Sequence, residues 1–284
     1  MIQQEKSPLS ALCILCHDAD AVLPFYRETL GMPPTRAEES FYSLKGPADK
    51  ATFCLWEIGH IARNSVFDDH PEDAIPNKYV LTVRVPSVAE IHALRAKVKL
   101  AGVQFLEAVG GNTDRQEFAF IDACGVIWHI LEGADALPAD GPVSLDRITL
   151  LCQDLSAARS FYEDKIGYRV ESDTDSQILY ETDGRTQLAL WAVADARVAF
   201  GLPDQTAIWK AHTGMIALSY PTSAEMTAQY ETLLNRGVTF NEKPAHFQWD
   251  FDASYFCDPD HNIWELFAIP QNIKDRMLPK NGED

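Results

Sequence analysis

The sequence predicts an α+β fold of four βαβββ units in two tandem modules, each a cupped, mostly antiparallel eight-stranded sheet with helices outside. Three observations support this prediction. The chain has 284 residues, about the length of two domains. Its two halves repeat each other in sequence. Each half also shows the same order of strand-like and helix-like patterns.

The repeat consists of four matched pairs of segments, separated by 135 or 136 residues. The pairs are 18–26 with 154–162, 86–91 with 221–226, 102–105 with 237–240, and 120–128 with 256–264. This constant spacing predicts a first module over 8–132 and a second over 144–268. The stretch 133–143 is small, polar and turn-rich, as is typical of a linker. Residues 269–284 then form a C-terminal tail.

Local patterns in the second module place the elements within each half. A helix is predicted over 156–165, ended by Gly167, and the next helix begins at a capping box of Thr222 and Glu225. Ser87 and Glu90 repeat that box in the first module. The stretch 193–213 and its counterpart 58–78 are expected to be loops that form pocket rims. Strands are predicted at 145–152, 177–182, 187–193, 215–220, 245–249, 253–257 and 262–268.

Composition restricts the partners of the protein. The formal net charge is −18, and acidic residues exceed basic ones in both halves, which argues against nucleic acid and anionic membranes as partners. No apolar run approaches the 18 or so residues that span a bilayer, and the N-terminus lacks the apolar segment of a signal peptide. We therefore expect a cytoplasmic protein whose partner is a small molecule, with a homodimer left open.

The six cysteines show no paired framework. Cys13 and Cys16 form a CxxC motif inside the apolar stretch ALCILC, which is predicted to be a strand. Residues three apart on a strand point to opposite faces, so we expect two buried thiols and not a redox or zinc motif.

Two signatures carry a family resemblance. Phe-Tyr followed by Leu-Gly or Ile-Gly occurs after the first helix of each module, and residues 258–266 read DPDHNIWEL. Both resemble the vicinal oxygen chelate superfamily of glyoxalases, bleomycin resistance proteins and ring-cleaving dioxygenases, with His261 where the family has glycine. The resemblance covers nearly the whole chain and implies the fold. It implies no single reaction, because the superfamily includes lyases, isomerases, dioxygenases and non-catalytic drug binders.

The resemblance also implies where metal ligands would stand: on the first and last strands of each βαβββ unit. Pairing of units within modules would bring together Ala11, Cys54, Val80 and His129, and separately Arg147, Ala189, Met215 and Glu265. Pairing across modules would bring together Ala11, Cys54, Met215 and Glu265, and separately Val80, His129, Arg147 and Ala189. Neither arrangement supplies three hard nitrogen or oxygen donors. We therefore expect no metal and no other cofactor, with a divalent metal as the alternative.

The same positions supply the candidate site residues. Glu265 and His129 are the candidates for acid–base catalysis, each with a structural role as its alternative. Arg147 either binds an acidic group of a ligand or pairs with Glu265. Four further residues are expected to line a pocket, with ordinary core packing as the alternative: Trp56, Trp191, Trp249 and Met215.

The missing metal triad favours metal-independent binding of a small aromatic or amphipathic molecule in a cupped pocket. Two alternatives stay open. The protein is a lyase, isomerase or ring-cleaving dioxygenase that uses Glu265 or His129, or it is an architectural module whose pockets are vestigial.

Overall fold

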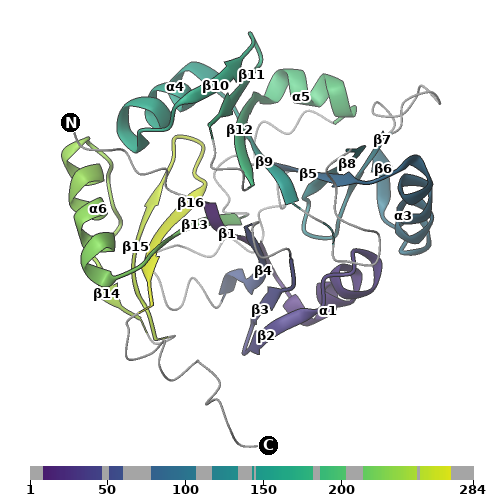
Figure 1. The fold of residues 1–284 in the computed structure, drawn as a ribbon, viewed down its shortest axis with the longest axis horizontal. Coiled ribbons are helices and arrows are strands. Elements are labelled where there is room, and N and C mark those ends of the chain that lie inside the picture. The colour runs from purple at the N-terminus through teal and green to yellow at the C-terminus, as the bar shows by residue number, and fades with distance from the viewer. Residues whose placement is uncertain are drawn as a thin grey trace, which may run out of the picture.

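The computed structural model describes residues 9–46, 51–59, 78–106, 117–133, 143, 145–181, 186–202, 214–247 and 250–269. Over these residues the chain forms two eight-stranded sheets of mixed direction with helices packed against them (Figure 1). The predicted α+β class and its four βαβββ units are confirmed. No helix among these residues is long and apolar enough to cross a membrane.

The first sheet combines the first and last units of the chain, in the order β14-β15-β16-β13-β1-β4-β3-β2. The first unit contains β1 (Leu9–Cys16), α1 (Ala19–Pro24), the π-helical segment η1 (Phe25–Thr29), β2 (Pro34–Glu38), β3 (Phe41–Leu44) and β4 (Thr52–Glu57). The last unit contains β13 (Gly214–Tyr220), α6 (Ser223–Asn235), β14 (Ala245–His246), β15 (Asp252–Cys257) and β16 (Ile263–Ala268).

The second sheet combines the two middle units, in the order β10-β11-β12-β9-β5-β8-β7-β6. The second unit contains β5 (Tyr79–Val85), α3 (Val88–Leu100), β6 (Gln104–Leu106), β7 (Glu117–Ile121) and β8 (Ile127–Glu132). The third unit contains β9 (Leu145–Cys152), α4 (Leu155–Ser160), the π-helical segment η2 (Phe161–Ile166), β10 (Val170–Asp173), β11 (Gln177–Tyr180) and β12 (Gln187–Ala192), and is followed by α5 (Val193–Phe200).

The prediction that each half of the chain closes its own sheet is wrong. Each sheet contains one unit from each half, joined by antiparallel pairing of β1 with β13 in one sheet and β5 with β9 in the other. In Figure 1 the purple strands β1–β4 accordingly lie beside the yellow-green strands β13–β16. All four units present a similar first strand at an open edge. Hydrophobic periodicity therefore does not determine which edges join.

Buried tyrosine–aspartate pairs hold the two sheets together. Tyr26 Oη donates to Asp122 Oδ2 at 2.7 Å, and Tyr162 Oη donates to Asp258 Oδ2 at 2.6 Å. In each pair the tyrosine follows the first helix of a half, while the aspartate belongs to a turn in the other sheet. The two signatures that carried the family resemblance are thus hydrogen-bonded partners across the core.

The turn 258–262 keeps its shape although a histidine replaces the usual glycine. His261 adopts φ 61°, close to the φ 74° of its counterpart Gly125. A left-handed conformation costs a residue with a β-carbon about 1–2 kcal/mol, so the surrounding contacts hold this turn in place. One of them joins the two halves of the chain, because the buried Lys78 Nζ donates to the carbonyl oxygen of Asp260 at 2.8 Å.

Most predicted elements agree with the structure to within a few residues. Both capping boxes also form: the Ser87 side chain accepts a hydrogen bond from the backbone N–H of Glu90, and the Thr222 side chain accepts one from that of Glu225. The loop expected over 193–213 is wrong for its first part, because α5 occupies Val193–Phe200. Ala196 and Phe200 of α5 are both buried, and their spacing of four residues places them on one face of the helix. Residues 203–213 of that stretch, and 60–77 of its counterpart, lie outside the described residues.

Candidate functional site

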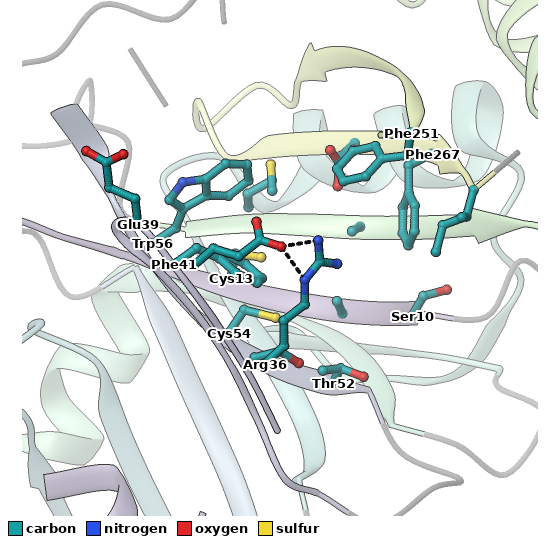
Figure 2. Close-up of a pocket in the computed structure, with 17 residues that line it drawn as sticks. Ser10, Cys13, Arg36, Glu39, Phe41, Thr52, Cys54, Trp56, Phe251 and Phe267 are labelled. Atoms are coloured by element: carbon teal, nitrogen blue, oxygen red, sulfur yellow. Dashed lines mark hydrogen bonds and ion pairs between the residues drawn. The ribbon is translucent and has the colours of Figure 1, made fainter. Parts of the chain in front are cut away.

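A cavity of about 490 Å³ opens on the concave face of the first sheet, between the first and last units of the chain. This volume lies within the range of small-molecule binding sites. Figure 2 shows side chains from both units around it. The cavity therefore exists only because the two ends of the sequence pair in one sheet.

The floor of the cavity contains the four positions that pairing across modules was predicted to bring together. Ala11, Cys54, Met215 and Glu265 all line it. Neighbours in register across a sheet point to the same side, and the register runs from Ala11 through Ala217 to Glu265. The alternative, pairing within modules, is excluded by the strand order.

Aromatic rings stand at two sides of the cavity. Phe41 and Trp56 contact each other edge-to-face at 5.3 Å between ring centroids, and Phe251 and Phe267 form a tilted pair at 5.6 Å. Figure 2 shows the first pair at the left of the view and the second at the right. A flat apolar ligand can therefore contact rings on both sides.

Among the described residues that line the cavity, Glu265 carries the one buried carboxyl group, and this residue is 4% exposed. Tyr255 Oη donates to Glu265 Oε1 at 2.7 Å. Burial raises the pKa of Glu265 to about 7, and the hydrogen bond from Tyr255 acts in the opposite direction. No basic side chain among the described residues forms an ion pair with Glu265, so at neutral pH this group exists in both protonation states.

Charged side chains at the rim are mostly acidic. Arg36 forms an ion pair with Glu38, drawn as dashed lines in Figure 2, and Glu39 lines the cavity at the left of the view, beyond Trp56. Among its described lining residues the cavity thus has three carboxyl groups and one guanidinium group, and that guanidinium is already paired. The site has an excess of negative charge when Glu265 is ionised.

Two thiols lie between the aromatic pairs. Cys13 and Cys54 are register partners on β1 and β4 and both line the cavity. Hydrogen bonding to Cys54, followed by burial, raises the pKa of Cys13 well above its usual value. Cys16 faces the opposite side of β1 and joins the main core with Cys124, which agrees with the predicted opposite orientation of Cys13 and Cys16.

The donor set at this site does not fit the divalent metal centre that the family resemblance implies. Such a centre uses three or more hard nitrogen or oxygen donors. Here the four equivalent positions supply one carboxylate, one thiol, one thioether and an alanine. Within the part of the chain that the structure describes, no group of three or more His, Cys, Asp or Glu side chains is placed to hold a metal.

The concave face of the second sheet is filled by the protein itself. Phe200 of α5 packs edge-to-face on Trp191 at 5.4 Å and on His129 at 5.6 Å between ring centroids. His129 Nε2 lies 3.2 Å from Glu117 Oε2. Burial lowers the pKa of His129, and Glu117 acts in the opposite direction. Trp191 and His129 therefore pack against Phe200 of α5. Both belong to the second sheet and do not line the open cavity of the first sheet.

Arg147 does not pair with Glu265, contrary to one of its predicted roles. The two residues belong to different sheets, β9 and β16. Arg147 Nε instead donates to Gln187 Oε1 at 3.0 Å, on the neighbouring strand β12. The expected pocket with Arg147, Trp191 and Glu265 in one cup is therefore not formed. Trp249 lies outside the described residues.

Sequence reasoning placed Trp56, Met215 and Glu265 in one cavity only as one of two alternatives, and it missed several neighbours. Cys13, Phe41, Tyr255 and Phe267 were not proposed as site residues. Cys13 and Phe267 stand two residues beyond Ala11 and Glu265 on the same strands, so strand alternation could have found them. Phe41 on β3 is the register partner of Trp56 on β4, and Tyr255 on β15 is the register partner of Glu265 on β16. Only this observed register places Phe41 and Tyr255 at the site.

Comparison with known proteins agrees with this architecture. The family model described as Glyoxalase/Bleomycin resistance protein/Dioxygenase superfamily matches residues 9–130 and again 144–266. A dioxygenase-like protein from Bacillus subtilis has a similar structure, with TM-score 0.65, 13% identity, and 94% of this chain and 86% of that chain covered. Glyoxalase I from Zea mays gives TM-score 0.60 and 15% identity, with 95% of this chain and 94% of that chain covered. At these identities the likeness concerns the fold alone. Among curated proteins, none matches the chain in sequence.

Proposed function

Because the chain belongs to the Glyoxalase/Bleomycin resistance protein/Dioxygenase superfamily, we propose that it binds a small aromatic or amphipathic molecule, without a metal, in the cavity of the first sheet. One observation carries this proposal. The four positions equivalent to metal ligands in the superfamily meet in a cavity of about 490 Å³ that has aromatic walls and lacks a hard donor set. Such a site combines apolar area with one buried polar group, as is typical of small-molecule pockets.

The contrast between the two sheets supports the same proposal. In the second sheet α5 covers the concave face and Phe200 fills it with apolar contacts. In the first sheet, by contrast, Trp56 lines the cavity of about 490 Å³. A vestigial pocket is expected to be filled like the second sheet, so we assign ligand binding to the first sheet alone.

Replacing Trp56 with alanine tests this assignment. We expect the affinity for N-phenyl-1-naphthylamine, a neutral fluorescent aromatic probe, to fall about ten-fold or more, because a stacking wall is lost. Fluorescence titration measures this change. Trp191→Ala is the matched control, because Trp191 occupies the equivalent place in the second sheet, against Phe200. It should lower stability and leave probe affinity within two-fold. Loss of binding in Trp191→Ala, with Trp56→Ala unaffected, would contradict the proposal.

One observation favours a second candidate function, catalysis by Glu265. A buried carboxyl group with a pKa of about 7 suits a general acid or base at neutral pH. Two measurements separate a lyase, isomerase or dioxygenase from a binding protein. Elemental analysis of protein purified without chelators reports whether a divalent metal is present in stoichiometric amount, and we expect none. If Glu265 is catalytic, the Glu265→Gln variant should lose turnover and still bind the substrate.

A further inference from the structure

We infer that the ligand of this cavity is an aromatic cation, whose positive charge pairs with the Glu265 carboxylate while its rings lie between the Phe41–Trp56 and Phe251–Phe267 pairs. This inference rests on the proposed function and names the class of its ligand. It differs from the expectation drawn from the sequence, in which Arg147 received an acidic group, because Arg147 lies in the other sheet.

The first argument is the unpaired charge on the cavity floor. Burying an ionised carboxylate without a cation is costly, and proteins ordinarily pair such a group. Glu265 is 4% exposed and lines the cavity, and its hydrogen-bond partner is the neutral hydroxyl of Tyr255. No cation of the described chain reaches it. A cationic ligand would supply the missing partner from the solvent side.

The second argument is the character of the walls. The faces of tryptophan and phenylalanine rings attract cations, and this attraction is strongest when the cation is shielded from water. Trp56 and Phe41 stand on one side of the cavity that Glu265 lines, and Phe251 and Phe267 stand on the other (Figure 2). Both features of the cavity, its rings and its buried carboxylate, therefore favour the same ligand charge.

The third argument is the electrostatic field at the entrance. Glu38 and Glu39 line the rim, and Arg36 there is neutralised by Glu38. The whole chain carries a formal net charge of −18. An anionic ligand would meet repulsion at the rim and again at the floor, whereas a cation is attracted at both.

The inference requires that binding of the cation strengthens as Glu265 ionises. The titratable groups that face Glu265 are Tyr255 on β15, Cys13 on β1 and Cys54 on β4, with Arg36, Glu38 and Glu39 at the rim. Burial raises the pKa of Tyr255, and hydrogen bonding and burial raise that of Cys13, so both stay protonated between pH 5.5 and 8.5. Because the pKa of Glu265 is about 7, affinity should rise over this interval and then level off.

A pair of isosteric probes tests the inference. The first is (2-naphthylmethyl)trimethylammonium, and the second is 2-neopentylnaphthalene, its neutral carbon isostere. Isothermal titration at pH 8.5 should show that the cation binds at least ten-fold more tightly than the isostere. This preference should shrink several-fold at pH 5.5 and disappear in Glu265→Gln. The control Glu231→Gln removes one carboxylate from the exposed face of α6 and should change neither affinity.

The outcomes distinguish the inference from the proposed function on which it rests. Equal binding of both probes at pH 8.5, or tighter binding of the neutral one, would overturn the cationic ligand and leave aromatic binding in place. Failure of both probes to bind would overturn the proposed function itself. A preference for the cation that persists in Glu265→Gln would place the charge recognition elsewhere and also refute the inference.

Discussion

Replacing Asp258 with alanine is expected to lower the free energy of unfolding by about 4 kcal/mol. The buried Asp258 carboxylate accepts hydrogen bonds from Tyr162 Oη at 2.6 Å, from the backbone N–H of Asn262 at 2.8 Å and from that of Asp260 at 3.0 Å. It also accepts one from the Asn262 side chain at 2.8 Å. Alanine leaves these donors without an acceptor, and each unsatisfied buried donor costs about 1–3 kcal/mol.

Urea denaturation followed by circular dichroism measures this loss. Asp154→Ala is the matched control, because Asp154 caps α4 with a single exposed hydrogen bond to the backbone N–H of Ala157. Removing such a cap costs about 1 kcal/mol. Equal losses for the two variants would contradict the structural role of Asp258. Asp258→Asn keeps an acceptor oxygen in place and should recover part of the stability.

The second large effect is a pH-dependent difference in stability between the wild type and Glu265→Gln. The folded-state pKa of Glu265, about 7, lies above the ordinary value of 4.5 because the group is buried. Below pH 4.5 both the folded and the unfolded state hold the proton. Between pH 4.5 and 7 the unfolded state releases it more readily, so the folded state loses stability as pH rises, and above pH 7 the loss is complete. The difference of about 2.5 pKa units corresponds to about 3 kcal/mol at most.

Glutamine cannot titrate, so the variant should not show this part of the pH dependence. Unfolding free energies of both proteins, measured in urea from pH 4.5 to pH 8.5, should differ by a term that grows through this interval and favours Glu265→Gln at high pH. Glu231→Gln serves again as the exposed control and should run parallel to the wild type. Parallel curves for Glu265→Gln and the wild type would show that Glu265 titrates normally in the folded protein.

The repeat and the strand periodicity were sufficient to predict much of this protein. They identified four similar units, the strand later numbered β9 at its observed bounds, both capping boxes, and the opposite orientation of Cys13 and Cys16. These features depend on residues close together in sequence or on the two-residue alternation of a strand. The family signatures were informative for the same reason, since each is a short continuous segment.

α5 shows where local reasoning failed. Small and polar residues over 193–213 suggested a loop, yet Val193–Phe200 forms a helix. This helix forms because Ala196 and Phe200 pack against apolar side chains of the second sheet. That surface exists only after β5 and β9 pair. Tertiary packing therefore decided both the helix and the loss of an open cavity on this side.

The sequence by itself determined the number and type of the units. It also determined which positions are equivalent to metal ligands, and that too few of them carry hard nitrogen or oxygen donors. Only the tertiary structure decided which units share a sheet, and with that choice it placed Glu265 with Trp56 and separated it from Arg147. The physical reason is that residue alternation specifies which face of a strand is buried, whereas four similar edge strands can pair in more than one way. The choice between pairings depends on contacts between residues more than a hundred positions apart, such as Tyr162 with Trp264 and Lys78 with Asp260.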